Sequence, residues 1–410
     1  MKPLQTQKSS NNFKLICASL LFSSLYLTPH SSDAQAILNF DGAYMYTEAN
    51  SLIHVNGDVT FADGNIAHNG VMELTGNWAN INENRNEAFD PSSTGDVKLI
   101  TGLQEIQGYA TTAFPSLSLE GWDTKRLIVN TKVTRNLNLN DIQLDVRGND
   151  MWVTNTATDA ITRSTGFVNT SNQPQGRLVR SVTANGSYDY PLGGGTDYRF
   201  RPVNAVAGDD GVLAAQFQNY DPNNDGYQRN NSVAENFNVI NDKFFHIVTQ
   251  VSGVNSADIK IPYSTTKDGN FNGLALWDDK HWADANYHYY GAEAGPDGTD
   301  MAMHYHMQSG GMHVLALTDT IASDPVFVVS GFTPNGDGKN DYFAIKGLEN
   351  YKFNELKVFN RWGKVVYTTV GYKNDWAGNG LEMDTYMYML KLKDMRGKER
   401  MITGDVTLIR

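Results

Sequence analysis

The last part of the chain carries four patterned segments: FTPNGDGKNDYF (332–343), VFNRWGKVVY (358–367), TYMYMLKLKD (385–394) and GDVTLIR (404–410). In the third segment Tyr and Leu residues alternate with Met and Lys residues, and side chains alternate between the two faces of a strand. The Trp362-Gly363 pair in the second segment offers a turn between two strands of a hairpin. The pattern therefore predicts a small antiparallel β-sandwich over residues 324–410, complete in itself.

Several motifs in this region follow one another in a characteristic order. The residues that carry them are Phe332, Pro334, Asn335, Gly336, Asp337, Gly338, Asn340, Asp341, Arg361, Trp362, Gly363, Trp376, Gly378, Val406, Leu408 and Arg410. In these positions the chain resembles the gliding-motility-associated C-terminal domain, which is the type B sorting domain of proteins exported by the type IX secretion system of Bacteroidetes. The resemblance covers about a fifth of the chain.

This resemblance implies a route of export and a set of partners. It implies that the type IX translocon recognises the domain, typically together with a PorP/SprF-type outer-membrane β-barrel. It also implies that residues 332–341, 361–363 and 406–410 face the export or anchoring machinery. It implies nothing about what the rest of the chain does outside the cell.

Residues 1–36 have the features of a cleaved secretory signal peptide. Three lysines precede an apolar run over residues 15–27, and Ala34-Gln35-Ala36 offers a cleavage site of the A-x-A type. A membrane anchor is the alternative, but the apolar run is short for a bilayer-spanning helix. Cys17, the one cysteine of the chain, lies inside this run, so we expect a mature protein without disulfides.

The composition narrows the classes of partner. The chain has a formal net charge of -12, and an acidic chain lacks the basic patch with which proteins bind nucleic acid. After the leader no apolar run approaches the ~18 residues of a spanning helix. Modest charge with plentiful Gly, Asn, Thr and Tyr is typical of an exported all-β protein.

Short alternating runs, separated by Asn, Gly and Asp, recur through residues 37–206. Examples are residues 52–55 before Asn56-Gly57 and residues 127–129 before Asn130. Strands of roughly three to five residues, at intervals of roughly 10–20 positions, predict either the stacked rungs of a β-solenoid or a many-stranded sandwich. We favour the solenoid, because short strands and Asn-rich corners suit its rungs.

Longer apolar runs replace the short ones in residues 207–323. They occupy residues 212–217, 244–251, 257–261, 274–277 and 312–317. This change predicts a second module, an immunoglobulin-like β-sandwich, with residues 320–325 as the linker to the C-terminal domain. The predicted fold is all-β throughout.

Two groups of oxygen-bearing side chains are candidate calcium ligands. Asp221, Asn223 and Asp225 have the spacing of the start of a calcium loop, but its twelfth position is Ser232 instead of the expected Glu. A turn held by local side-chain hydrogen bonds is therefore the favoured alternative there. Near the C-terminal motifs, the second candidate group consists of Asn335, Asp337 and Asp341, which family resemblance also explains as a structural turn.

Clusters of histidine and of aromatic residues fall in the second module. The histidines are His281, His288, His304, His306 and His313, and zinc is an alternative to the favoured placement on the surface. The aromatic residues are Trp277, Trp282, Tyr287, Tyr289 and Tyr290. Packing in the core and edges of the sandwich is favoured over a platform for sugar rings.

The mature chain contains no H-E-x-x-H or G-x-S-x-G motif and no cysteine nucleophile. We therefore predict an exported, non-enzymatic protein at the cell surface or outer membrane, which contacts a surface, a polymer, a glycan or another protein. Release to the medium is an alternative fate. The competing function is a carbohydrate-binding or polysaccharide-degrading surface protein, because paired carboxylates in a solenoid leave no sequence motif.

Overall fold

The computed structural model describes residues 24–27, 36–84, 87–195, 199–231, 237–285, 288–308, 310–320, 326–394 and 399–410. The chain forms two compact units, Met1–Ile321 and Ala322–Arg410. Most of the predicted signal peptide, residues 1–36, lies outside the described residues. Among the described residues no helix is long and apolar enough to cross a membrane.

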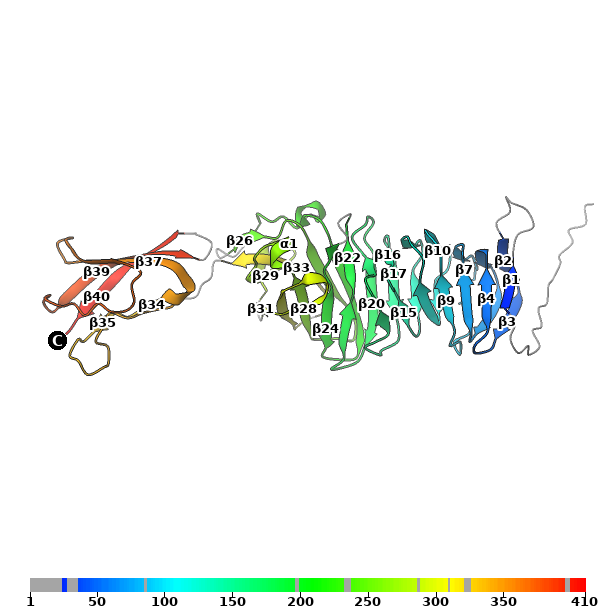
Figure 1. Cartoon of the computed structure of the whole chain (residues 1–410), viewed down its shortest axis with the longest axis horizontal. Coiled ribbons are helices and arrows are strands. Elements are labelled where there is room, and N and C mark those ends of the chain that lie inside the picture. Colours follow the sequence, from blue (N-terminus) through cyan, green and yellow to red (C-terminus); the bar gives the residue numbers. More distant parts are fainter. Residues whose placement is uncertain are drawn as a thin grey trace, which may run out of the picture. The chain divides into compact units, whose positions relative to one another are not determined.

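The first unit begins with a parallel β-solenoid, as predicted (Figure 1). Its first sheet contains β1 (Ser24–Leu27), β4 (Leu52–Val55), β7 (Val71–Leu74), β9 (Asp96–Leu99), β12 (Ser116–Leu119), β15 (Leu137–Asn138) and β18 (Ile161–Thr162). Its second sheet contains β2 (Ala36–Phe40), β5 (Gly57–Phe61), β8 (Trp78–Asn80), β10 (Gln104–Gly108), β13 (Lys125–Leu127), β16 (Gln143–Asp145), β19 (Phe167–Asn169) and β22 (Leu192–Gly194), with β23 (Arg199–Phe200) added antiparallel. A third side is formed by β3 (Ala43–Thr47) with β6 (Gly64–His68), and by β11 (Thr112–Phe114), β14 (Thr131–Val133), β17 (Asp150–Val153) and β20 (Arg177–Val182).

The alternating sequence explains the solenoid core. In β5 every second residue is buried, and the pattern repeats in β8 and β13. Parallel pairing places Val59 beside Trp78 and Trp78 beside Ile106, so inward side chains of successive rungs stack on one another. All three are fully buried. Burial of these stacks is the main source of stability in a unit whose strands are so short.

Glycine is required where consecutive rungs approach most closely. Gly108 has φ 119°, and a Cβ atom there would lie 1.9 Å from the carbonyl oxygen of Asn80 on the preceding rung. Gly64 and Gly121 meet the same obstacle against Ala43 and Thr101. A side chain at these corners would separate the rungs, because the clash is with backbone.

The third side of the solenoid continues into a sandwich. After β20 the sheet turns antiparallel and adds β25 (Gly211–Gln218), β27 (Phe245–Ser252), β33 (Met312–Thr320), β29 (Gly273–Trp277) and β30 (Trp282–Asp284), while β26 (Phe237–Ile240) pairs with β33. The facing antiparallel sheet contains β21 (Ser187–Tyr190), β24 (Val203–Ala207), β28 (Ala257–Tyr263), β32 (Met301–Met307) and β31 (His288–Ala292). Short helices are η1 (Pro222–Asp225), α1 (Thr265–Asp268) and η2 (Pro296–Gly298).

One hydrophobic core runs through both regions of the first unit. It extends from Phe40 in the solenoid to Leu317 in the sandwich. The predicted division at residue 206 does not separate two cores, because a single sheet and a single core pass across that position.

The second unit is a small domain with a core of its own. Its five-stranded sheet has the order β35 (Gly331–Phe332), β40 (Glu399–Leu408), β39 (Asp384–Asp394), β37 (Tyr351–Phe359) and β38 (Val365–Val370). A second sheet pairs β34 (Phe327–Val328) with β36 (Ile345–Lys346), and η3 (Leu348–Asn350) precedes β37. The strands pair antiparallel except for β35, which lies parallel to β40. The predicted all-β fold is confirmed in both units.

Candidate functional sites

The first candidate site is the turn that follows β35 in the second unit. The carboxylate of Asp341 accepts hydrogen bonds from the backbone N–H groups of Gly336, at 2.7 Å, and Gly338, at 2.8 Å. Asn335 and Asp337 bond to one another, since Asn335 Nδ2 donates to Asp337 Oδ2 and the N–H of Asp337 donates to Asn335 Oδ1. Gly336 and Gly338 have φ near 80°, a conformation that favours glycine.

These bonds explain why the turn needs this residue pattern. The oxygens proposed as calcium ligands already bind the turn's own N–H groups, so their arrangement fits a structural turn. The exposed turn also contains Asn340, with φ 53°, and it begins beside the half-buried Pro334. The calcium site stays a prediction without support from this geometry.

The tip of the hairpin between β37 and β38 is the second candidate surface. Asn360 Oδ1 accepts from the N–H groups of Trp362 and Lys364, each at 3.0 Å, which closes the turn. Arg361 pairs with Asp384 on β39. The side chain of Trp362 is 85% exposed and presents its indole to solvent beside Gly363. An indole held out in this way is well placed to contact another protein.

Three residues predicted to face the export machinery lie in the interior of the domain. Phe332, Val406 and Leu408 are each at most 1% exposed and pack in the core of the second unit. In the folded domain these three side chains therefore have a role in packing, and their contact with the export machinery stays a prediction. Arg410 is exposed, and its guanidinium donates to the carbonyl oxygen of Gly378 at 3.0 Å.

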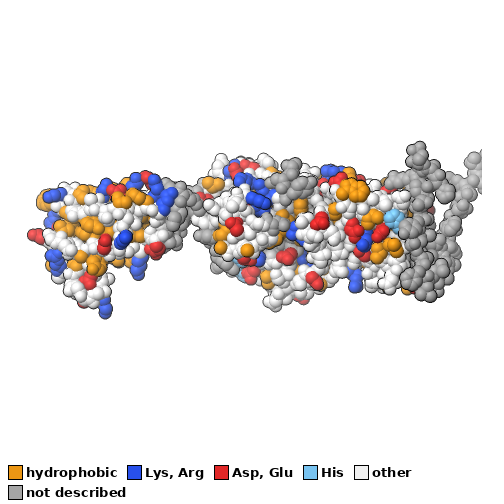
Figure 2. Space-filling view, viewed as in Figure 1, with side chains coloured by type: hydrophobic (Ala, Val, Ile, Leu, Met, Phe, Trp, Pro, Cys, Tyr) orange, Lys and Arg blue, Asp and Glu red, His pale blue; other side chains and the backbone are white. Residues whose placement is uncertain are grey.

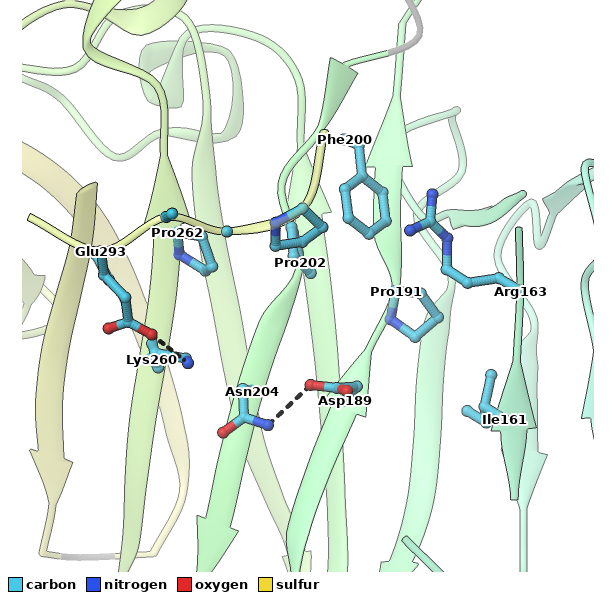
Figure 3. Close-up of a pocket in the computed structure, with 14 residues that line it drawn as sticks. Ile161, Arg163, Asp189, Pro191, Phe200, Pro202, Asn204, Lys260, Pro262 and Glu293 are labelled. Atoms are coloured by element: carbon cyan, nitrogen blue, oxygen red, sulfur yellow. Dashed lines mark hydrogen bonds and ion pairs between the residues drawn. The ribbon is translucent and has the colours of Figure 1, made fainter. Parts of the chain in front are cut away.

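The first unit contains a pocket that no sequence motif predicted. The cavity has a volume of about 310 Å³. It lies over the outer face of the sandwich sheet formed by β21, β24 and β28, beside β18 of the solenoid (Figure 3). Its lining comprises Ile161, Arg163, Asp189, Pro191, Phe200, Pro202, Asn204, Lys260, Pro262, Glu293, Ala294, Gly295, Pro296 and Ala302. Prolines and Phe200 make much of this surface apolar.

The polar groups of the pocket are held by contacts with one another. Asn204 Nδ2 donates to Asp189 Oδ1 at 2.8 Å, and Lys260 Nζ donates to Glu293 Oε1 at 2.7 Å. The Arg163 guanidinium lies over the Phe200 ring, 4.0 Å from its centre. The hydrogen bond from Lys260 lowers the pKa of Glu293, which is therefore ionised at neutral pH. A glycosidase needs a carboxyl group with a raised pKa as its acid, and Glu293 does not supply one.

The other calcium candidates are engaged in hydrogen bonds within their loop. Asp221 forms a two-point ion pair with Arg229, at 2.9 and 2.8 Å, and also accepts from the N–H of Asn223. Asp225 accepts from the Tyr220 hydroxyl at 2.9 Å. In the structure, the Asp221 carboxylate caps η1, and the Asp225 carboxylate holds the loop together through a hydrogen bond.

Three members of the histidine cluster have separate partners. His304 pairs with Glu293 at 3.2 Å, His306 with Asp258, and the buried His313 with the Tyr305 hydroxyl at 2.9 Å. Among the described residues no group of three or more His, Cys, Asp or Glu side chains is arranged to hold a metal ion.

The two tryptophans of the aromatic cluster pack against one another. Trp282 is fully buried, and Trp277 packs against it with ring centres 5.5 Å apart. Tyr227 contacts both rings and completes this smaller core. Tyr287 lies outside the described residues, as do the side chains of Tyr289 and Tyr290. This packing uses the two tryptophans in the way that the favoured alternative predicted.

The outer face of the first solenoid sheet carries charges of both signs, and Figure 2 shows red and blue side chains mixed over the solenoid. His54 pairs with Glu73 at 3.1 Å, and Lys98 with Glu120 at 2.9 Å. Glu73, Lys98 and Glu120 thus alternate in charge along this face, which neutralises it locally.

Comparison with known families agrees with the resemblance seen in the C-terminal motifs. Residues 326–408 match the CHU_C type IX secretion signal domain. No curated protein matches the chain. The second unit is therefore a type IX secretion sorting domain of type B, and the protein that carries it is exported to the cell surface.

Proposed function

We propose that this chain is a non-enzymatic structural or adhesion protein of the outer surface, retained at the outer membrane through its C-terminal domain. The observation that carries the proposal is the separate core of residues 326–408, which match the secretion domain while the solenoid and sandwich form another unit. The first unit is then the part displayed outside, and its stacked rungs offer long side faces for contact with a surface or polymer. Adhesion, gliding or envelope assembly would each use such a display.

Deleting residues 326–410 should leave the protein in the periplasm, because the first unit would lack the domain that the type IX system recognises. The measurement is cell fractionation combined with protease treatment of intact cells, and the full-length chain is the control. The first unit should stay folded, since it has its own core. Normal surface display of the truncated chain would overturn the proposed export route.

We further propose that a PorP/SprF-type outer-membrane β-barrel holds the exported protein. The exposed residues 335–340 of the turn and the exposed indole of Trp362 support this part of the proposal, because both are available to a partner. A pull-down of the tagged protein from gently solubilised outer membrane should recover the barrel in fixed proportion. Protein found in the medium without a membrane partner would argue for release.

A further inference from the structure

We propose that the pocket over β21, β24 and β28 binds a neutral saccharide, one or a few rings of a larger glycan. This inference goes beyond the proposed function, because it assigns a ligand class to a site in the first unit and does not depend on the route of export. The cavity, about 310 Å³, is at the lower end of the size range of small-molecule sites.

The outer face of the sheet presents a row of polar side chains. Backbone register pairs Asp189 with Asn204, Asn204 with Lys260, and Lys260 with His304 on four neighbouring strands. The row spans three strand spacings, roughly 14 Å. Figure 3 shows Asp189, Asn204 and Lys260 side by side along the floor of the pocket. The row is therefore long enough to follow more than one sugar ring.

An apolar row lies beside the polar one. Residues two positions apart on a strand share a face. Two positions from each polar residue of the row stands an apolar one: Pro191, Pro202, Pro262 and Ala302. All four line the pocket, and Figure 3 shows the three prolines running across it together with Phe200. Proline has no backbone N–H, so this row offers an apolar surface without a competing donor.

A pyranose ring matches the two rows. One face of the ring is formed by C–H groups, which can pack against the prolines, while hydroxyl groups project from its rim. Asp189 accepts hydrogen bonds, Lys260 donates them, and the Asn204 amide does both. Vicinal hydroxyls can exchange their hydrogen bonds to water for hydrogen bonds to this row. The exchange changes the free energy of binding little, but it makes recognition specific.

The balance of charge indicates a neutral sugar. Arg163 and Lys260 bring two positive charges to the lining, and Asp189 and Glu293 bring two negative charges. Lys260 is already paired with Glu293, and Arg163 lies over Phe200 while its Nε donates to a carbonyl. An acidic sugar would bring its carboxylate close to two carboxylates of the pocket, and that repulsion opposes binding.

The test is isothermal titration calorimetry on the mature full-length protein with hexasaccharides of neutral glucans, xylan, mannan and galactan, and with an acidic oligogalacturonide. We expect binding of at least one neutral hexasaccharide and none of the oligogalacturonide. The Asn204→Ala variant should weaken that binding by about tenfold or more, since it removes a hydrogen bond at the centre of the polar row. Asp189→Asn keeps the shape of the side chain and should weaken the binding of the sugar by a smaller factor.

The matched control is Asp258→Asn, on the outer face of the same strand as Lys260 but outside the pocket lining. It should change the affinity by less than about twofold, and all variants should unfold at the temperature of the unmodified protein. The proposal is overturned if none of the neutral sugars binds, if only the acidic one binds, or if Asn204→Ala binds as tightly as the control. Binding of a proline-rich peptide in place of sugars would also overturn it.

Discussion

Replacing Asp268 by alanine should lower the free energy of unfolding of the first unit by about 3–5 kcal/mol. Both partners of its ion pair are buried: Asp268 and Arg201 are 3% and 1% exposed. Arg201 donates from Nε at 2.6 Å and from its terminal nitrogen at 2.9 Å. Removing the carboxylate leaves a guanidinium in the protein interior without its counter-charge, and desolvation of that charge is the source of the loss.

The pair also connects three parts of the sandwich. Asp268 ends α1 and accepts from the N–H of Ser264 at 2.8 Å, and the Arg201 carbonyl accepts from His246 of β27 at 3.0 Å. Burial lowers the pKa of His246 to about 4, so its ring is neutral at pH 7 and donates this bond through Nε2–H. Loss of Asp268 should therefore loosen the contact of α1 with the segment between β23 and β24 and, through Arg201, with β27.

Thermal and urea unfolding of the full chain measure the effect, and Asp300→Ala is the matched control. Asp300 is exposed and bonds to the N–H of Thr265 at the start of the same helix, so its loss should cost only about 1 kcal/mol. The double variant Arg201→Met with Asp268→Leu should be more stable than Asp268→Ala, because it removes both charges. A single variant within about 1 kcal/mol of the unmodified protein would contradict this account.

The solenoid was favoured over a many-stranded sandwich because short strands and Asn-rich corners suit its rungs. Local alternation predicted the strands themselves, since strands such as β5, β8 and β13 bury every second residue. It did not predict that the sandwich shares a sheet with the solenoid. That connection depends on β20 pairing with β17 on one side and with β25 on the other. Long-range packing decides which strands pair with one another. The alternating pattern within one strand therefore does not show which strands lie beside it.

The candidate sites show the same limit. The pocket combines side chains from segments near residues 161, 189, 204, 260 and 293, none of which forms a motif by itself. The C-terminal motifs were visible because their residues lie close together in sequence. Even there, the motifs did not show that Trp362 is exposed and Phe332 buried, because burial depends on which side chains the fold packs against each residue.

Substituting Trp376 by alanine should destabilise the second unit by about 3–5 kcal/mol. The tryptophan is 6% exposed, and its ring lies 5.3 Å from Phe332 and 5.4 Å from Tyr367 between ring centres. Its backbone carbonyl accepts from the N–H of Phe343 at 2.9 Å, and alanine keeps this bond, so the loss comes from the ring. In a domain this small such a loss would lower the melting temperature by roughly 15 °C or more, measurable by circular dichroism on residues 326–410.

The same substitution connects the stability of the domain with export. If the type IX machinery recognises the folded domain, Trp376→Ala should leave more protein in the periplasm, and growth at lower temperature should restore display. Trp362→Ala is the control, because its exposed side chain contributes less than about 0.5 kcal/mol to stability. Loss of export in Trp362→Ala at unchanged melting temperature would identify the hairpin tip as a contact with the machinery. Full export of a thermally unfolded Trp376→Ala domain would instead mean that recognition requires only the linear motifs.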